Sequence, residues 1–242
     1  MEYPNFSKLS LNVKLAREEW LEACGERLPT WKSWKRLSGR DKKRLMHSVA
    51  LEADDSDSDS DSESDSETDY LTPYEQLDIQ LVMKNGLWSV EHVVPQSKTL
   101  TSASRSDPLG WTTATRNANS RRSNLPLMLW LAPDGKMALP NSIVKFNGVR
   151  HYAPPMEQRA RLARKWMYIR ATYSDEVESP SDAQIENASK IVALAHNYPI
   201  GEAESLVNSI YKRDYGWSNP LLTDKASRFY ESVEWRNLVF KK

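Results

Sequence analysis

A carboxylate and an imidazole at adjacent positions, Glu91 and His92, are the residues of this sequence best suited to catalysis. They follow residues 87–90 (LWSV), which we expect to form a short strand after the Asn-Gly turn signal at 85–86. Neighbouring side chains on a strand point to opposite faces, but a bend at the strand end lets both serve one site. We therefore expect Glu91 to bind a metal ion and His92 to act as a base.

Residues 111–124 (WTTATRNANSRRSN) form a polar segment that can complete such a site. We expect a helix here, with Thr112 or Thr113 as its N-cap and with Asn117 and Asn119 on it. Mg²⁺ takes oxygen ligands and retains several waters, so one glutamate and one asparagine suffice when phosphate and water fill the remaining positions. Forked guanidinium donors suit phosphate oxygens, and the segment supplies Arg116, Arg121 and Arg122.

The string WSVEHVVPQS, at residues 88–97, resembles the active-site strand of the endonuclease I family. These are non-specific nucleases with the ββα-metal (His-Me finger) motif. Further blocks resemble the family and follow in its order: NANSRRSNLPL, YAPPMEQRARLARKWMYIRATY, NYPIGEAE and GWSNPLL. The resemblance implies an α+β fold, in which a small ββα-metal core lies on a mostly helical body.

The resemblance also implies roles for individual residues. His92 matches the family's general base, which activates the attacking water, and Glu91 matches the carboxylate metal ligand. Aligning the asparagine block places Asn119 on the metal and leaves Asn117 as the alternative ligand. The implied cofactor is Mg²⁺, or Mn²⁺ or Ca²⁺ in its place.

The family's transition-state arginine lies between the histidine strand and the asparagine helix, where the loop of this chain is shorter. Arg105 and Lys98 are the two candidates in this loop. The family's Asp-x-His-Asn-Leu block reads DPLGW at residues 107–111 and so lacks the His-Asn pair. Asn219, in the block GWSNPLL, is expected to be structural.

The implied activity is metal-dependent hydrolysis of phosphodiester bonds in DNA, and in RNA as a second substrate, largely without sequence preference. The alternative is a non-catalytic nucleic-acid-binding or virion structural protein that keeps a relic nuclease fold. A further alternative is a chaperone that binds basic proteins through an acidic tract. The presence of Glu91, His92 and Asn119 together favours the enzyme, because a relic would not require all three.

The charge of the chain is unevenly distributed. Lysine and arginine number 33, as do aspartate and glutamate, but nine of the acidic residues lie between Asp54 and Asp69. The rest of the chain therefore carries a net charge of +9, which suits a polyanionic partner. Basic residues cluster with tryptophans between 27 and 44, and we expect nucleic-acid contacts there from Lys35, Arg36, Lys42, Lys43 and Arg44. A small helical bundle with the tryptophans in its core is the alternative for this segment.

Composition divides the chain into three parts. Residues 1–52 form a basic segment in which apolar residues recur at helical spacing: Leu9, Val13, Ala16, Trp20 and Leu21. Residues 53–69 (ADDSDSDSDSESDSETD) are expected to be a disordered acidic linker, and residues 70–242 the nuclease domain. The acidic run is either a plain linker, an intramolecular DNA mimic that occupies the basic cleft, or a docking tract for basic proteins.

The single cysteine, Cys24, cannot form an intramolecular disulfide, which favours a reducing compartment. Neither a signal peptide nor a membrane span is predicted. We therefore expect an intracellular protein of the cytoplasm or nucleus, or one that is viral or packaged in a virion, with no membrane partner.

Apolar periodicity predicts helices over 158–172, 182–196 and 201–211. Trp166 and Tyr168 are expected in the core of the first. The remaining histidines, His47, His151 and His196, carry no neighbouring pattern that indicates catalysis.

Overall fold

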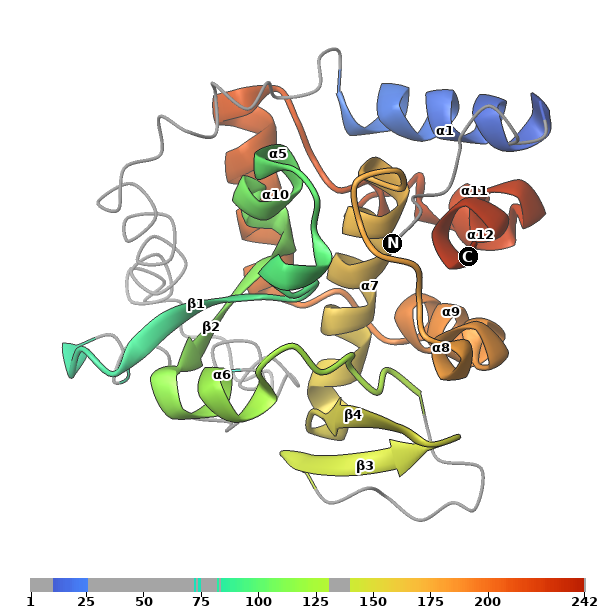
Figure 1. Ribbon diagram of the computed structural model, residues 1–242. Coiled ribbons are helices and arrows are strands. Elements are labelled where there is room, and N and C mark those ends of the chain that lie inside the picture. Colours follow the sequence, from blue (N-terminus) through green and yellow to red (C-terminus); the bar gives the residue numbers. More distant parts are fainter. Residues whose placement is uncertain are drawn as a thin grey trace.

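The computed structural model describes residues 11–25, 72, 74, 82, 84–130 and 140–241. Its elements are mixed: helices surround the long helix α7 (Met156–Thr172), one small antiparallel sheet lies beside it, and a second lies at its lower end in the view of Figure 1. The predicted α+β class is confirmed.

The first sheet pairs β1 (Trp88–His92) with β2 (Trp111–Thr115). In its register Glu91 lies opposite Thr112, and His92 lies opposite Trp111. Helix α6 (Arg116–Arg122) follows β2 directly and packs on both strands, so the three elements form a β-β-α unit. The strands are connected through η3 (Gln96–Lys98), α5 (Ser102–Ser106) and η4 (Pro108–Gly110).

The expected N-cap of the asparagine helix is wrong by two or three residues. Residues 111–115 are a strand, and Thr115 is the cap, accepting a hydrogen bond from the Ala118 N–H at 3.1 Å. The sequence Trp-Thr-Thr-Ala-Thr is rich in aromatic and β-branched residues, which favour a pleated strand once a partner such as β1 is present.

The second sheet is a hairpin that the sequence analysis did not predict. It pairs β3 (Ser142–Phe146) with β4 (Val149–Ala153) across a turn in which Asn147 and Gly148 have φ of 47° and 81°. Two positive φ angles are what a tight two-residue hairpin turn requires. One face packs on Trp130, whose ring lies 5.7 Å from that of Phe146 and 5.4 Å from that of His151.

Helix α7 forms the centre of the core, and every residue from Gln158 to Thr172 is buried. Trp166 and Tyr168 lie in the core as predicted. The buried Arg164 forms an ion pair with Glu204 of α10 (Glu202–Tyr215) and donates to the Ala195 carbonyl of α9 (Ala188–Asn197) at 2.9 Å. Three helices are therefore joined by one guanidinium.

The expected helix over 182–196 is divided into α8 (Asp182–Glu186) and α9. Asn187 interrupts it, with ψ of 16° and a side chain that donates to the Ala183 carbonyl at 2.9 Å. The third predicted helix is α10, which ends at Gly216 in the left-handed conformation (φ 66°). The remaining elements are η5 (Pro220–Leu222), α11 (Ala226–Glu231) and α12 (Val233–Phe240). Asn219 caps η5, which is a structural role.

Helix α1 (Leu11–Cys24) belongs to the same core as the nuclease domain. Trp20 is completely buried, donates to the Thr172 hydroxyl of α7 at 3.0 Å, and packs on Phe229 and Trp235. The predicted boundary between 1–52 and 70–242 therefore does not separate residues 11–25 from the main domain. The basic residues 35–44 and the acidic run 53–69 lie outside the described residues. None of the described helices is long and apolar enough to cross a membrane.

Candidate active site

Glu91 is held in a polar environment inside the β-β-α unit. It is only 2% exposed, and its Oε1 atom accepts a hydrogen bond from the Tyr74 hydroxyl at 3.1 Å. The same oxygen lies 2.6 Å from Nη1 of Arg122. Burial raises the pKa of Glu91, while Arg122 and Tyr74 act in the opposite direction. Both partners favour the charged carboxylate that a metal ligand requires.

Arg122 connects α6 to the end of β1. Its Nη1 donates to the His92 carbonyl at 2.9 Å and its Nη2 to the Val93 carbonyl at 2.7 Å. The sequence analysis assigned Arg122 to nucleic acid, and the structure corrects this. The side chain is 1% exposed and its donors are directed to Glu91 and to backbone, so it supports the site from inside.

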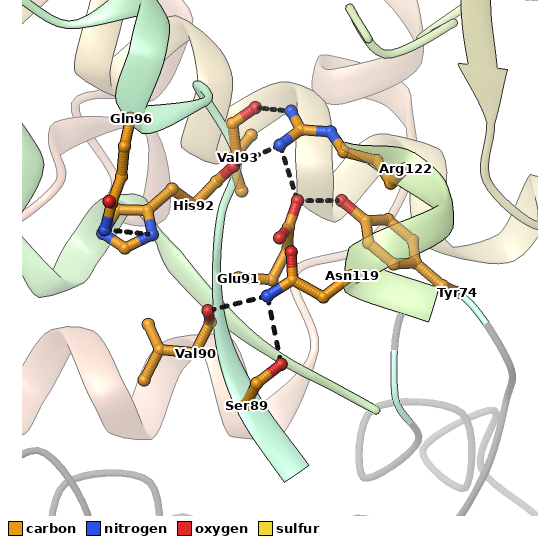
Figure 2. Close-up of polar contacts among 9 residues, drawn as sticks. All are labelled: Tyr74, Ser89, Val90, Glu91, His92, Val93, Gln96, Asn119 and Arg122. Carbon is orange, nitrogen blue, oxygen red and sulfur yellow. Dashed lines mark hydrogen bonds and ion pairs between the residues drawn. The ribbon is translucent and has the colours of Figure 1, made fainter. Parts of the chain in front are cut away.

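The amide of Asn119 has a defined orientation. Its Nδ2 donates to the Ser89 hydroxyl at 3.0 Å and to the Val90 carbonyl at 3.1 Å. Because the Val90 carbonyl can only accept, the amide nitrogen must face Ser89 and Val90, and Oδ1 lies on the opposite side of the amide. Figure 2 shows this oxygen and the second carboxylate oxygen of Glu91 pointing toward one another. Two oxygen donors from different elements therefore converge.

These donors fit a hard divalent cation. Among the described residues there is no group of three or more His, Cys, Asp or Glu side chains that could enclose a metal ion. A site of one carboxylate and one amide oxygen instead leaves most coordination positions to water and phosphate, as Mg²⁺ commonly does. Asn117, the alternative ligand, is exposed on α6, whereas Asn119 is half-buried against β1.

β1 keeps its regular antiparallel register through His92, which lines a pocket with Val90 and Trp111. The bend that was expected to bring Glu91 and His92 to one site is therefore not found within β1, and His92 lies on the other face of the strand. Its Nε2 lies 2.9 Å from the Arg105 carbonyl oxygen, and its ring packs edge-on against Trp111 at 5.7 Å. A carbonyl can only accept, so Nε2 carries the proton in this arrangement and Nδ1 carries the lone pair. The Gln96 amide nitrogen lies 3.4 Å from Nδ1 and 3.2 Å from Nε2 (Figure 2). With the proton on Nε2, Nδ1 is the ring nitrogen that can accept a proton.

A pocket of about 350 Å³ opens beside His92 and is lined also by Gln96, Arg105 and Trp111. Arg105 is exposed, and Thr99 orients it by accepting from Nε at 3.1 Å and from Nη2 at 3.0 Å. The alternative, Lys98, forms an ion pair with Glu178 and does not line this pocket. The structure therefore brings Arg105, rather than Lys98, to the histidine.

Two of the predicted nucleic-acid contacts remain on the surface. Arg116 begins α6 and is exposed, and Arg121 is exposed near its end, where Nη2 donates to the Asn141 carbonyl at 3.1 Å. The contacts predicted for Lys35, Arg36, Lys42, Lys43 and Arg44 fall outside the described part of the chain. The structure places His151 and His196 in ring contacts with Trp130 and Tyr230.

Sequence reasoning missed four residues that shape the site: Tyr74, Ser89, Gln96 and Trp111. Ser89, Gln96 and Trp111 lie within motifs quoted from the sequence, and the alternation of β1 could have placed Ser89 on the same face as Glu91. No local signal marks Tyr74, because its contact with Glu91 depends on tertiary packing.

A β-β-α unit that presents a carboxylate, an amide oxygen and an imidazole is the arrangement of a ββα-metal nuclease core. The sequence matches the family model described as Endonuclease I over residues 30–225, and the chain belongs to the endonuclease I family. Membership indicates a nuclease, with nucleic acid as the substrate. Searches among curated proteins and among solved structures gave no match.

Proposed function

We propose that the protein is a metal-dependent endonuclease that hydrolyses phosphodiester bonds of DNA, and of RNA as a second substrate, largely without sequence preference. The observation that carries the proposal is the orientation of Asn119. Its amide nitrogen is held by Ser89 and Val90, so its oxygen is directed to Glu91.

Glu91 and Asn119 would hold Mg²⁺, or Mn²⁺ or Ca²⁺ in its place. A cation bound there supplies electrostatic stabilisation of the negative charge that develops on the phosphate oxygens and the leaving oxygen. His92 accepts a proton from the attacking water at Nδ1, while the hydrogen bond from Nε2 to the Arg105 carbonyl fixes the ring. The Arg105 guanidinium, oriented by Thr99, donates to the phosphate.

The exposed Arg116 and Arg121 supply backbone contacts that carry no sequence information. Binding by such contacts weakens steeply with salt, because each neutralised phosphate releases counterions. A flat salt dependence of binding would contradict this part of the proposal.

The test is nicking of supercoiled plasmid by the full chain with Mg²⁺, with Mn²⁺ and with EDTA. Replacing the base in His92→Ala should lower the rate on the order of 10²–10⁴-fold. His196→Ala is the matched control, because that exposed imidazole stacks on Tyr230 at 4.9 Å, away from the pocket. Cutting that persists in EDTA or in His92→Ala would refute the proposal, and binding without cutting would favour the relic fold.

A further inference from the structure

The β3–β4 hairpin carries two cations directly opposite each other. Lys145 and Arg150 are register partners in the antiparallel pair, so their side chains share one face of the hairpin. Both are exposed. Within the described residues neither forms an ion pair, although Glu186 lies close to the turn and binds the Asn147 side chain at 2.8 Å.

A like-charged pair at directly opposite positions destabilises a two-stranded ribbon. The two strands thus place a concentrated positive charge on one face without an internal counter-charge from the described residues. Such a pair suits successive phosphates of a polyanionic chain, since lysine and arginine both donate to phosphate oxygens.

The face that carries this pair is linked to Glu91 through packed side chains. Side chains two residues apart on a strand share a face, so Tyr152 lies on the same side of β4 as Arg150. The Tyr152 ring packs against Tyr74 with centroids 5.0 Å apart, and the Tyr74 hydroxyl donates to Glu91. The hairpin is thus connected to the metal-ligand side of β1 through two aromatic rings.

A second contact joins the hairpin to α6. Arg121 donates to the carbonyl of Asn141, the residue that precedes β3, and the Asn141 side chain accepts from the Tyr152 hydroxyl at 3.3 Å. Arg121 of α6 therefore contacts the start of the hairpin directly. Figure 1 shows β3 and β4 below α6, at the opposite end of α7 from α1.

We infer that Lys145 and Arg150 form a second contact surface for the nucleic-acid backbone, which engages the substrate beyond the scissile phosphate. This inference rests on the proposed function. It adds that the affinity for a substrate depends on the length of that substrate. A substrate long enough to reach the hairpin gains these two contacts, and a minimal phosphodiester does not.

The test compares the wild type, the double variant Lys145→Gln/Arg150→Gln and the matched control Lys212→Gln/Lys225→Gln. Both control lysines are exposed and line a pocket with the last residues of α1, at the other end of the molecule. Binding of a duplex several helical turns long is measured in EDTA against salt. Cleavage of that duplex and of bis(p-nitrophenyl) phosphate is measured with Mg²⁺ or Mn²⁺.

The loss of two phosphate contacts should lower the slope of log affinity against log salt by about 2 in the hairpin variant alone. Its KM should rise for the long duplex, with kcat unchanged and with the small diester hydrolysed at the wild-type rate. If the slope of log affinity against log salt were the same in the hairpin variant and the wild type, the inference would be overturned. The proposed nuclease activity would not be affected by that result. A wild type that cuts neither substrate would refute the nuclease, and the salt slopes would still decide whether the hairpin binds nucleic acid.

Discussion

The guanidinium of Arg122 and the carboxylate of Glu91 form a buried ion pair, with Nη1 2.6 Å from Oε1 and side-chain exposures of 1% and 3%. The same guanidinium donates to the carbonyls of His92 and Val93. One side chain thus orients the carboxylate proposed as a metal ligand and holds the strand end that carries the proposed base.

Removing Arg122 should therefore destabilise the whole fold. Arg122→Gln leaves a buried carboxylate without its counter-charge, which costs about 3–5 kcal/mol of the free energy of unfolding. Denaturant unfolding of Arg122→Gln and of its exposed neighbour Arg121→Gln provides the comparison. The neighbour should change stability by no more than about 0.5 kcal/mol. Equal stability of the two variants would show that the pair does not support the site.

Tyr74 should act on metal affinity rather than on chemistry. Tyr74→Phe removes the hydroxyl that donates to Glu91, and the loss of such an outer-shell partner weakens metal binding about 10–100-fold. Calorimetric titration with Mn²⁺ measures this, and activity at saturating metal should remain close to that of the wild type. Tyr152→Phe is the control, because its hydroxyl donates to Asn141. An unchanged Mn²⁺ affinity in Tyr74→Phe would contradict the arrangement.

The two asparagines of α6 should differ sharply. Asn119→Ala removes a direct oxygen ligand, so its loss of Mn²⁺ affinity should exceed the roughly 100-fold upper range for outer-shell changes. Asn117→Ala changes an exposed residue one position before Ala118 and should bind like the wild type. If Asn117→Ala bound Mn²⁺ more weakly than Asn119→Ala, Asn117 would be the metal ligand and Asn119 would not.

A buried carboxyl outside the site predicts a pH dependence of stability. Asp107 is completely buried and accepts from the hydroxyls of Tyr168 at 2.6 Å and Tyr173 at 3.0 Å. Burial raises its pKa to about 6. The folded state therefore retains this proton more tightly than the unfolded state, whose carboxyl titrates near 3.8.

The contribution of Asp107 is fully present below the unfolded pKa and is lost as the pH rises through the folded pKa. From well below pH 3.8 to well above pH 6 the whole fall amounts to about 3 kcal/mol, at roughly 1.4 kcal/mol per pKa unit. In Asp107→Asn the fall should disappear, so the difference between the two free energies of unfolding should follow this window. A difference that is constant from pH 4 to pH 7 would exclude the shifted pKa.

The acidic run supplies the last prediction. We propose that it occupies the basic surface, so deleting residues 54–69 should raise the cutting rate at low salt. The effect should fade as the Debye length shortens to about 3 Å near 1 M salt. A variant with every Asp and Glu of this run changed to Asn and Gln keeps its length and should match the deletion. Identical kinetics for all three proteins would leave the run as a plain linker.

Local patterns were sufficient to predict the strand with Glu91 and His92 and the helix that became α7. The apolar run, the Asn-Gly turn and the 3.6-residue period all act over short distances. The hairpin at 142–153 carries a comparable Asn-Gly signal at its turn, and this signal alone could have predicted the hairpin.

Other features depend on tertiary contacts that a single sequence does not contain. Arginine is expected on a surface, and only the fold brings the three oxygen acceptors of Glu91, His92 and Val93 around Arg122. The pairing of β1 with β2 likewise decided that residues 111–115 became a strand, although threonine can also cap a helix.

Because Trp20 is buried, the segment that connects α1 to Tyr74 is attached to the core at both of its ends. Helix α1 is anchored by Trp20 and by the Ser218 N–H, which donates to the Cys24 carbonyl at 2.8 Å, and Tyr74 is buried in the same core. The segment between Cys24 and Tyr74 therefore begins and ends at the same folded core. Any contact it makes with that core is unimolecular, so dilution cannot abolish it. A single proteolytic cut within it would leave α1 seated in the core, and the nicked protein would migrate as one species until it is denatured.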